Sequence, residues 1–107
     1  MANPEHIEIL KQSIEVWNKW RLENPDIVPD LKNTDFLDDN LISLDLSDIH
    51  FYSTNLTAAN FGAAFLNNAN LNKANLHRAD LRNANLSNAK LRNANLSEAN
   101  LQQANLH

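Results

Sequence analysis

The sequence of 107 residues contains no cysteine and a single glycine, Gly62. Without cysteine the chain forms neither a disulfide framework nor a thiolate zinc site, which is typical of proteins from a reducing compartment. With one glycine it cannot form the glycine-rich loop that surrounds phosphates in nucleotide-binding proteins. No apolar run is long enough to cross a bilayer, and the first residues do not form a signal peptide. We therefore expect a soluble, cytoplasmic protein.

Charge is distributed unevenly along the chain, whose formal net charge is −4. Residues 25–66 contain seven acidic residues and one basic residue, whereas residues 67–107 contain five basic residues and two acidic ones. The basic part is too weak to form the electrostatic surface of a nucleic-acid-binding domain. We therefore expect no direct binding to nucleic acid, and no binding to a membrane.

The first part of the chain predicts one amphipathic α-helix. Asn3 suits the N-cap and Pro4 the first helical position, and the helix is expected to end at Leu22 or Glu23, before Pro25. Apolar residues at helical spacing form a stripe, which two tryptophans continue. The stripe consists of Ile7, Leu10, Ile14 and Trp17, with Trp20 beside it. The tryptophans suit a contact with a partner or, as we favour, with an apolar surface of this same chain.

The rest of the chain repeats every five residues. Sixteen successive positions at this spacing, from Leu31 to Leu106, are leucine or phenylalanine. In an α-helix five residues advance by about 500°, so these side chains would lie on different sides of the cylinder. In a flat strand an odd spacing would place them on alternating faces. The period therefore predicts a solenoid, in which the chain turns a corner in each repeat and every leucine faces a common axis.

The other positions of the repeat fit such a corner. Alanine lies two residues before each leucine from Ala59 to Ala104, where we expect it to point inward and to leave no room for a larger side chain. The Asn or Asp between them is expected to point outward and bond the backbone, and Asn two residues after the leucine suits positive φ. The predicted core is Leu56, Phe61, Leu66, Leu71, Leu76, Leu81, Leu86, Leu91, Leu96, Leu101, Ala69, Ala74, Ala79, Ala84, Ala89 and Ala94.

The motif Ala-(Asn/Asp)-Leu-x-x resembles that of the pentapeptide repeat family, and the leader before it is similar to that of many bacterial, especially cyanobacterial, members. The resemblance implies an all-β solenoid, a right-handed quadrilateral parallel β-helix with four repeats in each coil of twenty residues. Residues 29–107 would then form about four coils. Residues 1–28 would form a capping α-helix and linker, with Leu10, Ile14 and Trp17 covering the first coil.

The first coil departs from the pattern. The inward position that alanine occupies later is Asp39, Leu44 and Ile49 in earlier repeats. An inward Asp39 is costly to bury unless it is paired, so we expect this coil to be wider or open there. Leu44 and Ile49 are too bulky for a tight corner and are expected to receive the helix.

The sequence gives no sign of catalysis. The four histidines are scattered without metal-ligand spacing, and the acidic residues between Asp35 and Asp45 lack the pattern of a calcium-binding loop. We expect Ser87 and Ser97 to have no base beside them in any repeat register. We therefore expect no catalytic, cofactor-binding or metal-binding residues, no small-molecule substrate, and no enzymatic activity.

The most plausible function is that of a non-catalytic structural or binding module, which contacts an unknown protein partner through the faces of the solenoid. Some members of the family inhibit DNA gyrase by imitating DNA, and this alternative would require acidic residues along the whole length. The last coil has no cap in this sequence. Two interpretations stay open for it: a homodimer through the C-terminal coil, or the N-terminal part of a longer multidomain repeat protein.

Overall fold

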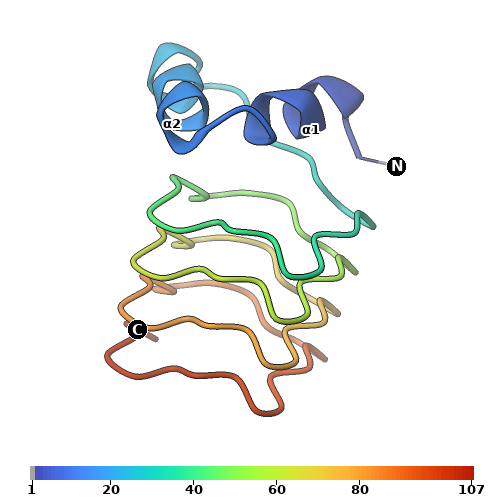
Figure 1. Cartoon of the computed structure of the whole chain (residues 1–107), viewed down its shortest axis with the longest axis vertical. Coiled ribbons are helices and arrows are strands. Elements are labelled where there is room, and N and C mark those ends of the chain that lie inside the picture. The colour runs from blue at the N-terminus through green and yellow to red at the C-terminus, as the bar shows by residue number, and fades with distance from the viewer. Residues whose placement is uncertain (1) are drawn as a thin grey trace.

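The computed structural model describes residues 2–107 and measures 33 × 26 × 23 Å. Two short α-helices lie across one end of a stack of coils (Figure 1). They are α1, Pro4–Leu10, and α2, Ile14–Glu23. The coils begin at residue 30, and the end of the chain lies in the coil farthest from the helices.

The prediction of one continuous helix was wrong, because the helix is interrupted at residues 11–13. Ser13 is the N-cap of α2, and its hydroxyl oxygen accepts from the Val16 N–H at 3.1 Å. Serine bonds readily to nearby backbone, which makes it a poor residue for a helix interior and a good one for a helix start. The start of α1 is as predicted, since the Asn3 side chain accepts from the Glu5 N–H at 2.9 Å.

The coils are joined by parallel bridges between residues twenty apart, from Asp30 with His50 to Asn85 with Asn105. The backbone ladder is continuous: the Leu31 N–H donates to the His50 carbonyl at 2.9 Å, and the Leu71 N–H to the Lys90 carbonyl at 2.8 Å. Within residues 2–107 every such contact is a single bridged residue, and none extends into a longer strand. Because the chain turns a corner in each repeat, no extended segment is long enough to form a longer strand. The solenoid is therefore built from single bridges and turns.

The turn chemistry predicted for the repeat is confirmed. All fifteen non-glycine residues with positive φ lie two positions after a repeat centre, with φ between 54° and 62°. The outward Asn or Asp accepts from the backbone N–H two residues later, as Asn60 does from Gly62 at 2.9 Å. This bond holds the corner from outside while the leucine fills it from inside.

The core fills the axis of the stack. The repeat centres from Leu31 to Leu86 are at most 3% exposed, and the alanines from Ala59 to Ala84 at most 1%. The members of the predicted core in the last coil are only partly buried, because no described residue lies below them; they are Leu91, Leu96, Leu101, Ala89 and Ala94.

Side chains of the helices satisfy the upper edge of the first coil on one side of the stack. The Asp45 N–H donates to the Asn18 side chain at 2.8 Å, and the Asp45 carbonyl accepts from the Trp17 indole at 2.8 Å and from the Arg21 guanidinium at 2.7 Å. These bonds replace the ladder bonds that a further coil would supply. Trp17 is fully buried.

A second side of the first coil is satisfied in the same way. The Asp30 N–H donates to His6 Nδ1 at 3.0 Å, and the Asp30 carbonyl accepts from the Asn3 N–H at 2.9 Å. Leu10 is buried and Ile14 is partly buried against the core. The helices therefore bond to the coil mainly around Asp30 and Asp45, where the Asn18 side-chain amide also donates to the Ser43 carbonyl at 3.2 Å. Residues 36–41 receive no hydrogen bond from them within the described chain.

Candidate functional site

The outward side chains stand in columns, because residues twenty apart lie one above the other on successive coils. Successive coils are separated by about 4.8 Å, the spacing of neighbouring strands. Any two outward residues separated by twenty positions are therefore within contact distance. This spacing is the signal that identifies neighbours on the faces of the stack.

One such pair is His77 and Ser97, and it overturns the expectation that Ser97 has no base beside it. His77 Nδ1 lies 2.7 Å from the Ser97 hydroxyl oxygen, and His77 Nε2 lies 3.5 Å from a carboxylate oxygen of Glu98. The Ser97 hydroxyl also donates to the Asn95 side chain at 2.7 Å. The imidazole is a second acceptor within reach of this proton, and the direction of its bond with Ser97 depends on the His77 tautomer. The cluster joins two coils.

Two arginines in the same coils are neutralised locally. The Arg78 guanidinium donates to the Glu98 carboxylate at 2.8 Å, and this hydrogen bond, with the charges of Arg78 and His77, lowers the pKa of Glu98. The Arg82 guanidinium donates to Asp80 at 2.6 Å and 2.9 Å, which lowers the pKa of Asp80. These faces therefore present little net charge.

A third group of cations is not neutralised. Lys73, Lys90 and Arg92 form no ion pair within residues 2–107, and all three belong to repeats of one column. Lys73 Nζ lies 5.7 Å from the centre of the Tyr52 ring in the coil above. The acidic residues gather instead in the first coil and its linker. This polarity gives no support to DNA mimicry, which needs acidic residues along the whole stack.

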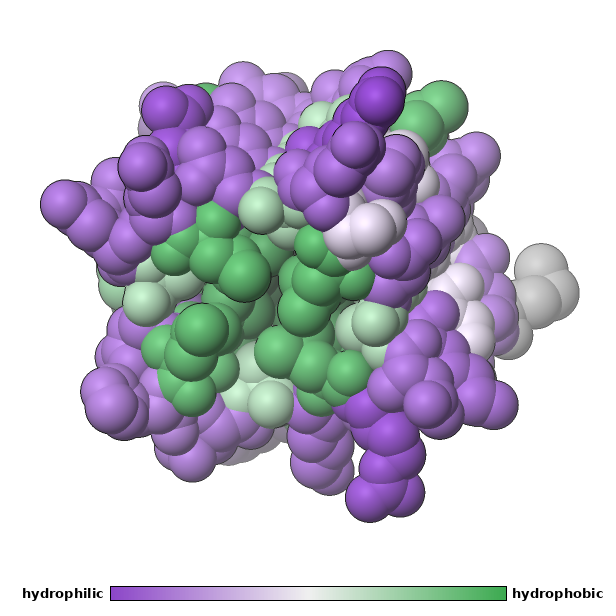
Figure 2. All heavy atoms as spheres, turned by 90° about the horizontal axis from the view of Figure 1, so that it is seen from below, coloured by the Kyte–Doolittle hydropathy of each residue, from purple (hydrophilic) through white to green (hydrophobic). Residues whose placement is uncertain are grey.

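The end of the stack farthest from the helices is apolar. Figure 2 views this end and shows hydrophobic side chains filling its centre inside a hydrophilic rim. Leu106 is 58% exposed, whereas Leu86 in the coil above is 3% exposed. The backbone N–H groups of Leu91, Leu96 and Leu101 make no hydrogen bond within the described residues, although their counterparts in each upper coil do. A continuous apolar surface with a free backbone edge is suited to association.

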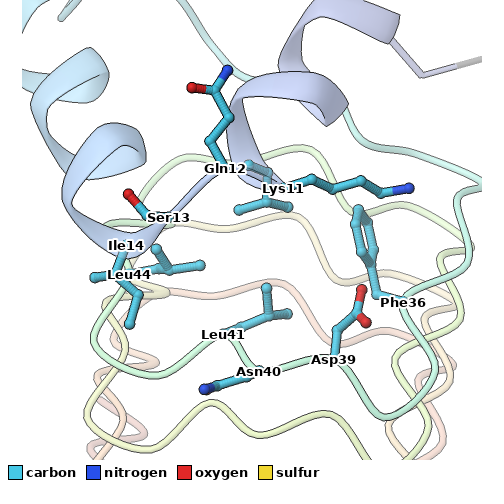
Figure 3. Close-up of a pocket in the computed structure, with 10 residues that line it drawn as sticks. Lys11, Gln12, Ser13, Ile14, Phe36, Asp39, Asn40, Leu41 and Leu44 are labelled. Carbon is cyan, nitrogen blue, oxygen red and sulfur yellow. The ribbon is translucent and has the colours of Figure 1, made fainter.

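A cavity of about 510 Å³ lies at the other end, between the first coil and the interruption of the helices (Figure 3). It is formed where the helices do not bond to the coil. Its lining is half apolar and half polar, and Asp39 contributes the only acidic side chain; the apolar lining residues are Leu10, Ile14, Phe36, Leu41 and Leu44.

Comparisons with known proteins agree with this architecture. A family model described as "Pentapeptide repeats (8 copies)" matches residues 49–88 and 79–107, more than half of the chain. The chain belongs to the pentapeptide repeat family. Its members with known structures are right-handed quadrilateral β-helices. No curated protein matched the sequence.

Two solved pentapeptide repeat proteins from the cyanobacterium Nostoc PCC 7120 are similar to this chain. HetL, described as involved in heterocyst differentiation regulation, is 32% identical over 69% of the chain, with a TM-score of 0.68. The protein alr5209 is 38% identical over 68% of the chain, also with a TM-score of 0.68. The present chain spans 35% of HetL and 60% of alr5209. The likeness establishes the family and the fold.

Members of the pentapeptide repeat family are generally structural modules, and no enzymatic family matches this chain. Within residues 2–107 no three histidine, aspartate or glutamate side chains gather in a way that would hold a metal ion. Asp45, one of the acids considered for calcium, lies 3.8 Å from Arg21 and accepts from the Ser47 hydroxyl at 2.6 Å. Neither of the described helices is long and apolar enough to cross a membrane.

Proposed function

We propose that this pentapeptide repeat protein is a non-catalytic protein-binding module. Its outward groups form a rigid surface whose positions are fixed by the ladder and the turns. The cluster of His77, Ser97 and Glu98 joins two coils. The function that such a scaffold supports best is to present fixed contacts to another polypeptide.

The observation that carries this proposal is the apolar end shown in Figure 2. The partly buried leucines there would each contribute about 1.5–3 kcal/mol if they were fully covered. The edge also offers both kinds of backbone group, since the Leu91 N–H and the Ala89 carbonyl have no partner in the described chain. A partner that covers this end would continue both the core and the ladder.

We propose a second copy of the same chain as this partner. Two copies related by a two-fold axis would place leucine layer against leucine layer, because a two-fold interface pairs a surface with itself. The donors and acceptors of one edge would face acceptors and donors of the other. The unpaired cations add a polar rim and the leucines form the centre, which is the common anatomy of protein interfaces.

Light scattering of the 107-residue chain over an about hundredfold range of concentration tests this association. We expect the molar mass of a dimer at high concentration and a lower value on dilution, because a dimer dissociates when it is diluted. Leu101→Asp places a charge in the apolar end and is expected to weaken association at least about tenfold. Leu37→Asp is the matched control, because Leu37 is 51% exposed on the side of the first coil. A monomer at every concentration, or equal association of both variants, would contradict self-association through this end.

A further inference from the structure

The cavity below the helices results from a departure in the sequence. In the coils below, the corner position of Asp39 is held by Ala59 and Ala79, which are both fully buried. Asp39 is only partly buried, and its side chain rises from the coil toward the helices beside Phe36 (Figure 3). The helix interruption at residues 11–13 lines the same cavity. The carboxylate and the interruption therefore border the same space.

The Asp39 carboxylate has no partner in the described chain. Its backbone N–H donates to the Phe36 carbonyl and its carbonyl accepts from the Asn60 N–H, but no hydrogen bond or ion pair engages the side chain within residues 2–107. An unpaired carboxylate beside apolar walls is unfavourable, because the charge has lost part of its water. A bound cation would remove this cost.

Backbone groups at the floor of the cavity are also free. Asp45 and Asp30 have both their N–H and their carbonyl bonded by helix side chains or backbone, whereas the N–H and the carbonyl of Asn40 make no hydrogen bond within residues 2–107. Asn40 lines the cavity next to Asp39. The cavity therefore offers a carboxylate and a carbonyl, two acceptors of the kind that an ammonium group with three donors requires.

The remaining lining sets the shape of the ligand. Phe36, Leu41 and Leu44 are at most 3% exposed and form the closed floor of the cavity, whereas Leu10 and Ile14 of the helices supply its more accessible apolar surface. The volume of about 510 Å³ lies within the range of small-molecule sites. An apolar wall with a few placed polar groups selects a molecule that has one charged end and an apolar body.

We propose that this cavity binds a small organic cation, a primary ammonium group on a short apolar body. The ammonium group lies against Asp39 and the Asn40 carbonyl, and the apolar body lies against Leu10 and Ile14. The inference is independent of the association proposed for the opposite end of the stack. Lys11 also lines the cavity without an ion pair to Asp39, and its positive charge disfavours a second cation there.

The first experiment varies the ligand. The protein is titrated with n-pentylammonium, 1-pentanol and pentanoate, and the methyl signals of Ile14, Leu41 and Leu44 are followed by NMR. We expect saturable shifts with pentylammonium, and binding at least about tenfold tighter than that of pentanol, because only the cation pairs with Asp39. Pentanoate is expected to cause no saturable shift. N-acetyl-lysine methylamide tests whether the ammonium group can belong to a lysine side chain. If this compound also binds, the site accepts a lysine of another polypeptide; if it does not, the site accepts only a free amine.

The second experiment varies the protein. Asp39→Asn keeps the shape and removes the charge, so we expect pentylammonium to bind at least about tenfold more weakly and pentanol to be unaffected. Asp38→Asn is the matched control: Asp38 is exposed in the same repeat, and its positive φ of 60° suits asparagine. Lys11→Gln is expected to have the opposite effect: loss of a positive charge from the lining should strengthen pentylammonium binding several-fold.

Three results would overturn the proposal: equal affinity for pentylammonium and pentanol, unchanged cation binding in Asp39→Asn, or equal losses in Asp39→Asn and Asp38→Asn. Circular dichroism of each variant shows whether the coils are intact. If Asp39→Asn does not fold, Lys11→Gln decides, and unchanged or weaker cation binding in that variant counts against the site.

Discussion

His77 Nδ1 lies 2.7 Å from the hydroxyl oxygen of Ser97, although the two residues are twenty positions apart in the sequence. The coil places one directly over the other, and the bond links two coils on an exposed face. The pair has the residue types of a hydrolase, but the Ser97 hydroxyl also has the Asn95 side chain as an acceptor. Proximity alone does not make a nucleophile.

This arrangement predicts that Ser97 has no role in ester hydrolysis. We expect Ser97→Ala to leave the rate of p-nitrophenyl acetate hydrolysis by the protein unchanged. Any slow background from an exposed imidazole would fall in His77→Ala instead. A rate that depends on Ser97 would show that the hydroxyl proton moves to His77, contrary to this prediction. Urea unfolding of both variants is expected to show losses of no more than about 1 kcal/mol.

Ala84→Leu tests the inward assignment of the alanines. Ala84 is 1% exposed and lies at a corner between buried leucines. A leucine there has no free space to enter, so we expect overpacking to lower the free energy of unfolding by about 1–3 kcal/mol or more. Thermal unfolding by circular dichroism measures the loss. Ala94→Leu is the control, because Ala94 is only partly buried in the last coil and a larger side chain can turn outward. Equal effects would contradict the role of the corner.

Phe65→Asn is expected to stabilise the protein. Phe65 is 51% exposed in the position where most repeats have an Asn or Asp that accepts from the N–H two residues later. In its column Asp45 and Asn85 make this bond, whereas the Asn67 N–H makes none in the described chain. Asparagine would restore it and add about 0.5–1.5 kcal/mol. Phe65→Ala removes the same aromatic ring without supplying the acceptor, so it should not reproduce the gain in thermal stability.

The coil architecture was predictable because one side-chain requirement recurs in every repeat. Leucine inside, alanine at the corner and asparagine outside each fix one position, and the structure has the corresponding burial, φ angles and bonds. The interruption at Ser13 was not predictable in this way. The stripe of apolar residues continues through the interruption and gives no sign of it. Whether the helix stops there depends on the free energy gained by the Ser13 cap relative to that of extending the helix by one more turn.

The sites were less predictable than the fold, for a geometric reason. The contact of His77 with Ser97 follows once residues twenty apart are known to be neighbours, so the twenty-residue register is the sequence signal for this contact. The sequence predicted a wider or open first coil at Asp39, but the coil keeps its regular bridges and turn there, and the cavity lies between the coil and the helices. Its extent depends on where the helices bond to Asp30 and Asp45, which no local pattern encodes.

Asp39→Ala is expected to raise the free energy of unfolding by about 1 kcal/mol. The substitution places alanine at this corner, as in the coils below, and removes an unpaired carboxylate. Urea unfolding measures the change. Asp38→Ala is an unsuitable comparison because Asp38 has positive φ, so Asp38→Asn serves as the control that removes one charge. A loss of stability in Asp39→Ala would mean that the carboxylate has a partner within the folded chain.

The ion pair of Asp80 with Arg82 predicts a dependence of stability on pH. Asp80→Asn isolates the pair, because asparagine is the residue of the same column at Asn60 and Asn100 and retains the acceptor for the backbone N–H of residue 82. The hydrogen bonds from Arg82 hold the pKa of Asp80 below its ordinary value of 3.8. A group whose pKa is lowered in the folded state adds stability above its unfolded pKa and loses it as the pH falls through the folded value.

The native protein should therefore be more stable than Asp80→Asn at neutral pH, by a small amount because the pair is largely in solvent. The difference should stay constant down to about pH 4, the ordinary pKa of aspartate, and vanish below the folded pKa. Urea unfolding of both proteins across this range measures it, and the contribution of Glu98 cancels because it is common to both. A difference that persists when Asp80 is protonated would mean that Asp80 stabilises the coil through its hydrogen bonds alone, without its charge.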